Sequence, residues 1–241
     1  MPDVKRPAAL AKVYHAAYNK IEAREIPTVP LADSQTLYRS VNPASPYTLL
    51  PQPKPGGHVS KLQANRLLIP GDGAIDLHNR FSGPSGDPGI PAASGLYCVQ
   101  QQQALVNEST HYSGKAPFWA LANRCVLRIR VMGTALVADL SPHNPRAMRF
   151  LRELGPKTWE EMNDPQDCSV ARGIGLAIAQ SSYLHGLSVE TVRESERSAD
   201  ERGDNLVLYA RQGQAVPNLY IDQAWYFGKT SRPEKYPVNF P

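Results

Sequence analysis

The sequence predicts an α+β fold in which a mixed or antiparallel, split sheet is flanked by helices. Three observations favour this class. Strand-like segments alternate with single helical segments, but without the regular spacing of a doubly wound sheet. The chain has 241 residues, 41% hydrophobic and 20% charged, which is enough for a folded core. Its 17 glycines and 22 prolines indicate long loops between elements.

The first expected element is an amphipathic helix over residues 7–25, followed by a proline-rich stretch at 27–55 that stays extended. A short strand is expected within that stretch, at 36–40. The apolar positions that define the helix face are Leu10, Val13, Ala17 and Ile21.

A long loop is expected at 70–94, where nine of 25 residues are glycine or proline. Loops of this length in a compact domain are more often functional than idle. A strand at 95–99 and a helix from Gln100 to about Tyr112 follow this loop. The sequence therefore places a loop, a strand and a helix in direct succession.

The second half of the chain also contains both expected strands and expected helices. Residues 124–140 show the period-two alternation of a half-buried strand, with Arg128 and Arg130 opposite the apolar positions Leu127, Ile129 and Val131. Helices are expected near 145–154 and 168–185, the second with Ile174, Ala177 and Ile178 on one side and ending at Gly186. A last strand is expected at 205–209.

Charge and hydropathy exclude several classes of protein. The 26 basic and 22 acidic side chains leave a net charge of +4 without any basic run, so no nucleic-acid partner is expected. No stretch reaches the 18 apolar residues of a membrane helix, and the N-terminus lacks a signal-peptide core. We therefore expect a cytoplasmic protein without a membrane partner, acting in its own cell or delivered into the cytoplasm of another.

The cysteines and histidines indicate neither a disulfide framework nor a metal site. The cysteines are far apart and form no C-x-x-C pair, so buried, reduced thiols are expected at Cys98, Cys125 and Cys168. The six histidines show no ligand spacing. A phosphate-binding P-loop and a G-x-S-x-G nucleophile elbow are also absent from the sequence.

Five polar or aromatic sites occur in a specific order along the chain. An arginine in Leu-Tyr-Arg is followed by Arg-Phe in the glycine-rich loop, by Gly-Leu-Tyr, by a glutamate eleven positions later, and by Ser-x-Arg before the last strand. Each site alone has an ordinary structural explanation as a salt bridge, a solvated side chain or a charged turn. The residues concerned are Arg39 with its neighbour Tyr38, then Arg80, Tyr97, Glu108 and Ser195.

In this order the five sites resemble the RES-domain family, which includes the toxins of RES–Xre toxin–antitoxin pairs. The resemblance covers about residues 36–210. It implies an ADP-ribosyltransferase-like catalytic domain over 36–210, preceded by a helical extension at 1–35 and followed by a tail at 211–241 packed on the same domain.

The resemblance also implies an activity, in which NAD⁺ is the substrate and no resident cofactor is needed. Glu108, Arg39 and Ser195 would be catalytic, and Arg80, Tyr97 and Tyr38 would join Arg39 and Ser195 in binding NAD⁺. The expected reaction cleaves the nicotinamide–ribose bond, and an antitoxin or immunity protein is the expected partner. Two alternatives stay open: a mono-ADP-ribosyltransferase with a protein acceptor, and a non-catalytic binding module.

The residue types suit this chemistry. Guanidinium groups bind the two phosphates in planar, bidentate geometry. A carboxylate stabilises the positive charge that develops on the ribose, and a tyrosine ring offers a face to nicotinamide. Adjacent strand residues face opposite sides of a sheet, so Tyr38 and Arg39 are expected on different faces.

Overall fold

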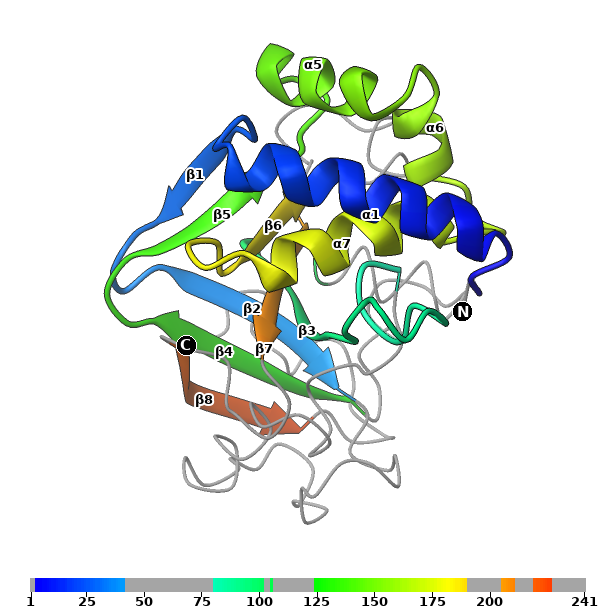
Figure 1. The fold of residues 1–241 in the computed structure, drawn as a ribbon. Coiled ribbons are helices and arrows are strands. Elements are labelled where there is room, and N and C mark those ends of the chain that lie inside the picture. Colours follow the sequence, from blue (N-terminus) through cyan, green and yellow to red (C-terminus); the bar gives the residue numbers. More distant parts are fainter. Residues whose placement is uncertain are drawn as a thin grey trace.

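The computed structural model describes residues 3–41, 80–101, 105, 124–189, 205–210 and 219–226. In these ranges helices pack on one face of a curled, mixed sheet, which confirms the α+β class (Figure 1). The described helices are α1 (Pro7–Glu22), α5 (Pro145–Leu154), α6 (Thr158–Met162) and α7 (Ser169–Gln180). The described strands are β1 (Thr28–Leu31), β2 (Thr36–Val41), β3 (Ser94–Val99), β4 (Cys125–Val131), β5 (Ala135–Asp139), β6 (Gly186–Val189), β7 (Asn205–Ala210) and β8 (Leu219–Tyr226).

The described strands lie in the order β1-β5-β6-β7-β3-β2-β4-β8. Neighbours run antiparallel except β5 and β6, which are parallel. Within the described residues, strands β3 and β2 pair at a single position, where Val99 lies opposite Tyr38. This narrow junction divides the sheet into a helix half (β1, β5, β6, β7 and β3) and an arginine half (β2, β4 and β8).

Apolar side chains fill both faces of the sheet. The first core cluster lies between the helix half and helices α1 and α7, which run side by side across it (Figure 1). The second core cluster lies on the opposite face and takes side chains from both halves, including Leu96 of β3 and Leu127 of β4. The sheet thus curls around the second cluster while the helices cover the first.

The pairing of α1 with α7 follows from their sequences. The expected apolar face of α1 is confirmed, since Leu10, Val13, Ala17 and Ile21 are all buried. Gly173 of α7 allows close approach, because a Cβ there would lie 2.4 Å from Val13 Cγ1.

Helix α7 ends earlier than the sequence predicts. Ser181 adopts an extended conformation with φ −65° and ψ 139°, so the helix stops at Gln180 rather than near 185. The chain then enters β6, a fully buried strand that begins at Gly186, the residue expected to end the helix.

The alternating segment 124–140 forms two strands instead of one. A turn at Gly133, with φ +74°, separates β4 from β5, and the Gly133 N–H donates to Asp33 Oδ1 at 2.6 Å. Strand β5 therefore leaves β4 and pairs with β1 and β6 at the far side of the sheet.

Segments outside 36–210 share this core. Helix α1 contributes to the first cluster, β1 pairs with β5, and β8 pairs with β4.

All three cysteines are free and buried, as predicted. None of the helices in the described ranges has the length and apolar character needed to span a bilayer.

Candidate functional site

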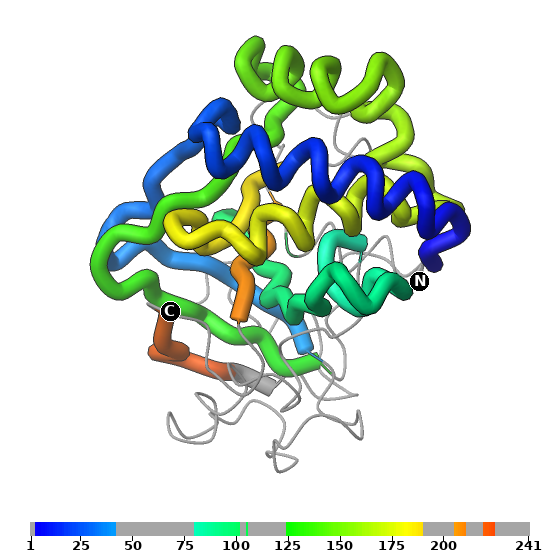
Figure 2. Tube along the Cα trace, viewed as in Figure 1, coloured from blue at the N-terminus to red at the C-terminus, as the bar shows by residue number. Residues whose placement is uncertain are grey.

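The structure brings the predicted residue Tyr97 together with the Arg80–Phe81 dipeptide. The Tyr97 hydroxyl on β3 accepts a hydrogen bond of 3.2 Å from the Phe81 N–H. Phe81 is buried in the first core cluster, and the Gly83 N–H donates to the Ala93 carbonyl at 2.7 Å. Figure 2 shows this segment running from beside α7 into β3. The glycine-rich loop and its strand are therefore packed as one unit.

The guanidinium of Arg80 is directed towards the helices. Its Nη1 donates a hydrogen bond of 2.8 Å to the carbonyl of Met162, the last residue of α6. Burial raises the pKa of the nearby Cys168 thiol, and the positive charges of Arg172 and Arg80 act against this shift. Two guanidinium groups therefore lie near the start of α7.

Tyr38 and Arg39 face opposite sides of β2, as their adjacency predicts. Arg39 pairs with Leu127 of β4 and lies between Leu37 and Val41 on β2. These three apolar neighbours all belong to the second core cluster. Arg39 thus shares the face of that cluster.

Tyr38 lies on the same face as Tyr97. Tyr38 pairs with Val99, two positions beyond Tyr97 on β3, and residues two apart on a strand share a face. Tyr97 packs against the first core cluster. The structure thus brings both tyrosines to one face at the junction of the two halves, and it puts Arg39 on the other face.

Glu108 and Ser195 lie outside the described residues. The strand ends that precede their segments share one partner: Val99 of β3 and Val189 of β6 both pair with Asn205 of β7. Glu108 follows Val99 by nine positions, and Ser195 follows Val189 by six. Both segments therefore leave the sheet from the same end of the helix half.

The arginine half carries a row of guanidinium groups that the prediction of the site did not include. Arg124 Nε donates to Ser40 Oγ at 2.6 Å. Arg128 Nε and Arg130 Nε each donate to Asp222 of β8, at 3.0 Å. The alternation in 124–140 predicted that Arg128 and Arg130 share a face, but not that one carboxylate bridges them.

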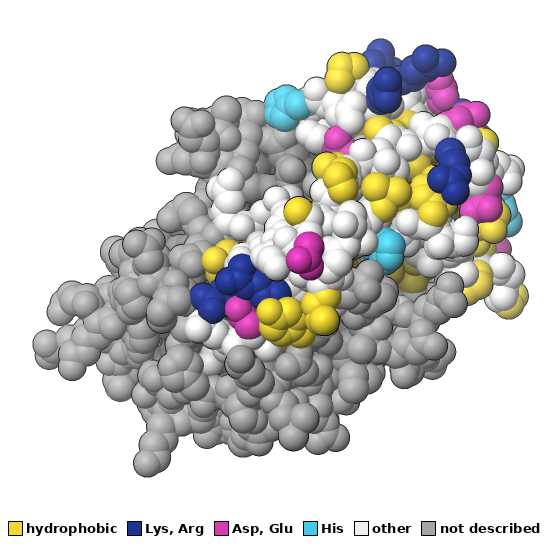
Figure 3. Space-filling view, turned by 90° about the vertical axis from the view of Figure 1, so that its left-hand side faces the viewer, with side chains coloured by type: hydrophobic (Ala, Val, Ile, Leu, Met, Phe, Trp, Pro, Cys, Tyr) yellow, Lys and Arg dark blue, Asp and Glu magenta, His cyan; other side chains and the backbone are white. Residues whose placement is uncertain are grey.

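Asp222 balances part of this charge. Burial disfavours its ionised form, but hydrogen bonds and charge from Arg128 and Arg130 outweigh burial and lower its pKa. A β-bulge between Arg128 and Ile129 interrupts the pairing of β4 with β8 at this point. Basic, acidic and hydrophobic side chains lie next to one another on the lower part of the described surface in Figure 3.

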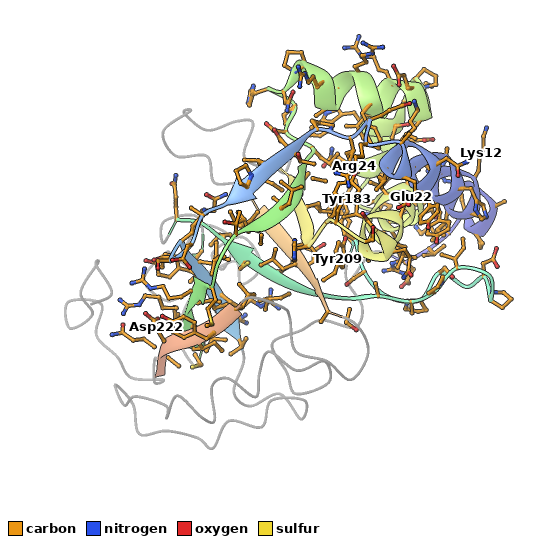
Figure 4. The ribbon with its side chains drawn as sticks, turned by 60° about the vertical axis from the view of Figure 1, so that its left-hand side comes forward. Lys12, Glu22, Arg24, Tyr183, Tyr209 and Asp222 are labelled. Carbon is orange, nitrogen blue, oxygen red and sulfur yellow. The ribbon has the colours of Figure 1, made fainter. Side chains whose placement is uncertain are left out.

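A second residue missed by the sequence analysis is Tyr209 of β7. Its hydroxyl donates to the Phe81 carbonyl at 3.1 Å, so Phe81 is bonded by tyrosines on both its N–H and its C=O. Gly175 of α7 leaves room for this contact, because a Cβ there would lie 2.1 Å from the Phe81 oxygen. In Figure 4, Tyr209 lies near the helices, well apart from Asp222 on β8.

The described residues contain no group of three or more His, Cys, Asp or Glu side chains that could hold a metal ion. Searches of protein-family models, curated proteins and solved structures found no match to this chain. Any assignment of function therefore depends on the residues themselves.

Proposed function

We propose that this chain is an NAD⁺-consuming enzyme of the RES type, with an ADP-ribosyltransferase-like fold, that cleaves the nicotinamide–ribose bond in a cytoplasm. The observation that carries the proposal is the 3.2 Å contact between the Tyr97 hydroxyl and the Phe81 N–H. It joins two of the five motifs, one on β3 and one in the loop before it. The segments with Glu108 and Ser195 leave the sheet from strand ends that share one partner, Asn205.

Arg80 binds the pyrophosphate in this proposal. Its bond to the Met162 carbonyl fixes the direction of the guanidinium, and a fixed planar donor is suited to bidentate contacts with phosphate oxygens. Tyr97 and Tyr38, which share a sheet face, supply the aromatic surface for nicotinamide. Arg39 faces the other side of β2, so its contribution requires that the ligand reach around the edge of the junction.

Glu108 stabilises the transition state. When the bond between ribose C1′ and the nicotinamide nitrogen breaks, the electron pair stays on that nitrogen and nicotinamide leaves as a neutral molecule. The positive charge that develops on the ribose is stabilised by the carboxylate, which also holds the 2′-hydroxyl. An oxygen of water or phosphate then bonds to C1′ and loses its proton to solvent, while Ser195 donates to a ribose hydroxyl or to phosphate.

An enzyme of this kind depletes the NAD⁺ of the cell that contains it. We therefore propose an antitoxin or immunity protein as its partner. A mono-ADP-ribosyltransferase would use the same pocket with a nucleophilic side chain of a protein as the acceptor. One observation favours a non-catalytic binding module. The Met162 carbonyl already accepts a hydrogen bond from the Arg80 guanidinium, as expected if this side chain only holds the fold together.

The decisive experiment incubates the purified chain with NAD⁺, with and without inorganic phosphate, and identifies the products by mass. We expect nicotinamide together with ADP-ribose or its phosphate ester. Glu108→Gln should lower kcat by about 10²-fold or more while the melting temperature stays unchanged, because the carboxylate acts on the transition state.

Glu153→Gln, which alters an exposed helical glutamate of α5, is the matched control and should retain full activity. Label from NAD⁺ appearing on a protein would favour the transferase instead. Absence of both nicotinamide release and any thermal shift with NAD⁺ would contradict the proposal and favour the binding module.

A further inference from the structure

We infer that Tyr209 is a positioning residue, which with Tyr97 fixes the Phe81 peptide groups and thereby orients Arg80 towards the pyrophosphate of the ligand. This inference rests on the proposed function of Arg80. In this role Tyr209 acts through the backbone of the loop, by its bond to the Phe81 carbonyl, and not by direct contact with the ligand.

The first support is the geometry at Phe81. The Tyr97 hydroxyl accepts from the Phe81 N–H at 3.2 Å, and the Tyr209 hydroxyl donates to the Phe81 carbonyl at 3.1 Å. The two peptide groups that flank Phe81 are therefore each held by a tyrosine. The first of them is the peptide bond that joins Arg80 to Phe81.

The second support is the way Tyr209 is held. It pairs with Gly95 across β7 and β3, and its N–H donates to the His185 carbonyl at 2.9 Å. The side chain is buried in the first core cluster. Burial raises the pKa of Tyr209 well above its ordinary value, so the hydroxyl keeps its proton and remains a donor.

The third support is the glycine at position 175 of α7. A Cβ at Gly175 would lie 2.1 Å from the Phe81 oxygen and 2.7 Å from the Tyr209 hydroxyl. Helix, strand and loop therefore meet at one point, which any larger residue on α7 would disturb. Since Arg80 Nη1 is bonded to Met162 of α6, the loop has one anchor on the backbone of Phe81 and a second on the guanidinium.

The test compares Tyr209→Phe with Tyr183→Phe. Each change removes one hydroxyl that donates to a main-chain carbonyl, because Tyr183 donates to the Ile21 carbonyl at 2.8 Å, away from the loop. Three quantities are measured on the full chain: affinity for ADP-ribose by calorimetry, KM and kcat for NAD⁺, and hydrogen exchange of the amides in 81–93.

We expect Tyr209→Phe to weaken ADP-ribose binding and raise KM about tenfold with kcat nearly unchanged, since the lost hydrogen bond acts equally on ground state and transition state. Exchange of the loop amides should become faster. Tyr183→Phe should leave the binding, the KM and the exchange of 81–93 as in the parent. The two variants thus separate positioning from a general loss of stability.

The inference and the proposed function fail in different ways. If the parent consumes NAD⁺ but Tyr209→Phe matches the parent in KM and loop exchange, the positioning role is overturned and the activity stands. If both tyrosine variants change KM and loop exchange equally, the role is also overturned. If the parent neither binds ADP-ribose nor consumes NAD⁺, the proposed function fails, and a role in orienting Arg80 for that ligand is overturned with it.

Discussion

The two halves of the sheet are stabilised in different ways. In the helix half, α1 and α7 cover one face and the second core cluster covers the other, so apolar side chains pack on both faces. In the arginine half, one face joins the second cluster, but the other carries Arg124, Arg128 and Arg130. Stability therefore depends on close packing in the first half and on paired charge in the second.

Under the proposed function, this difference bears on which side of the junction would adjust to NAD⁺. The helix half brings backbone atoms into contacts that tolerate no added atom, such as Gly175 against the Phe81 oxygen. The arginine half is held instead by hydrogen bonds between side chains, such as those of Arg128 and Arg130 with Asp222. The junction between them, at Tyr38 and Val99, joins a close-packed side to a side held by paired charge.

The largest effect on stability is expected from Gly175→Ala. Its methyl group would overlap the Phe81 carbonyl, because a Cβ at this position would lie only 2.1 Å from the oxygen. Overpacking against backbone should lower the free energy of unfolding by about 3 kcal/mol. Urea denaturation of the parent and the variant measures this difference.

Gly173→Ala is the control on the same helix. A Cβ at position 173 would meet Val13 and Leu10 of α1 instead of the loop. We expect Gly173→Ala to destabilise the protein, while hydrogen exchange of the backbone amides in 81–93 stays at the parent's rate. Equal stability of Gly175→Ala and the parent would show that the helix half is less tightly packed than the distances indicate.

An intermediate effect is expected from Asp167→Asn, at the start of α7. Burial disfavours the charged carboxylate, but hydrogen bonds from Ser169, Arg6 and the backbone outweigh it and hold its pKa well below the usual range. A depressed pKa stabilises the fold above the unfolded pKa of about 3.9, and this contribution is lost as pH falls through the folded value.

At pH 7 the Asp167→Asn variant should lose about 2 kcal/mol in the free energy of unfolding. Below about pH 4 the gap between parent and variant should narrow steadily as pH falls, because the carboxylate of the unfolded parent takes up a proton while that of the folded parent is still ionised. Melting temperatures from pH 2 to 7 test this. A constant gap across that range would contradict the role assigned to the carboxylate.

The smallest effect is expected from Asp222→Asn, in the arginine half. The side chain of Asp222 is 14% exposed and bridges Arg128 and Arg130, whose side chains are 16% and 31% exposed. Loss of its charge should cost about 1 kcal/mol in dilute buffer. At roughly 1 M salt the cost should shrink, because salt screens charge pairs near the surface. A salt-independent cost would mean that packing, and not charge, stabilises this half as well.

Elements with a clear period were predictable from the sequence. The faces of α1 and β4 follow the 3.6-residue and two-residue periods of their apolar residues, and α5 has the predicted bounds. Strand β6 was missed because all four of its residues are buried, so no alternation marks it. Strand β8 was missed because the region 211–241 has no period and several prolines.

The candidate site was predictable only in part, because register is a long-range property. Alternation alone separates Tyr38 from Arg39, but the pairing of Tyr38 with Val99 decides which of them shares a face with Tyr97. Tyr209 looks like any aromatic residue of a strand. Its partner is 128 residues away, and no local pattern encodes such a contact.

The contact between α1 and α7 also has a consequence during synthesis of the chain. The apolar face of α1 is complete once Glu22 has been made, but its main partner begins at Ser169. At about 10 residues per second, a ribosome takes about 15 s to make the residues between them. For that time Leu10, Val13 and Ile21 lack their main partner, so α1 can reach its native packing only late in the synthesis of the chain.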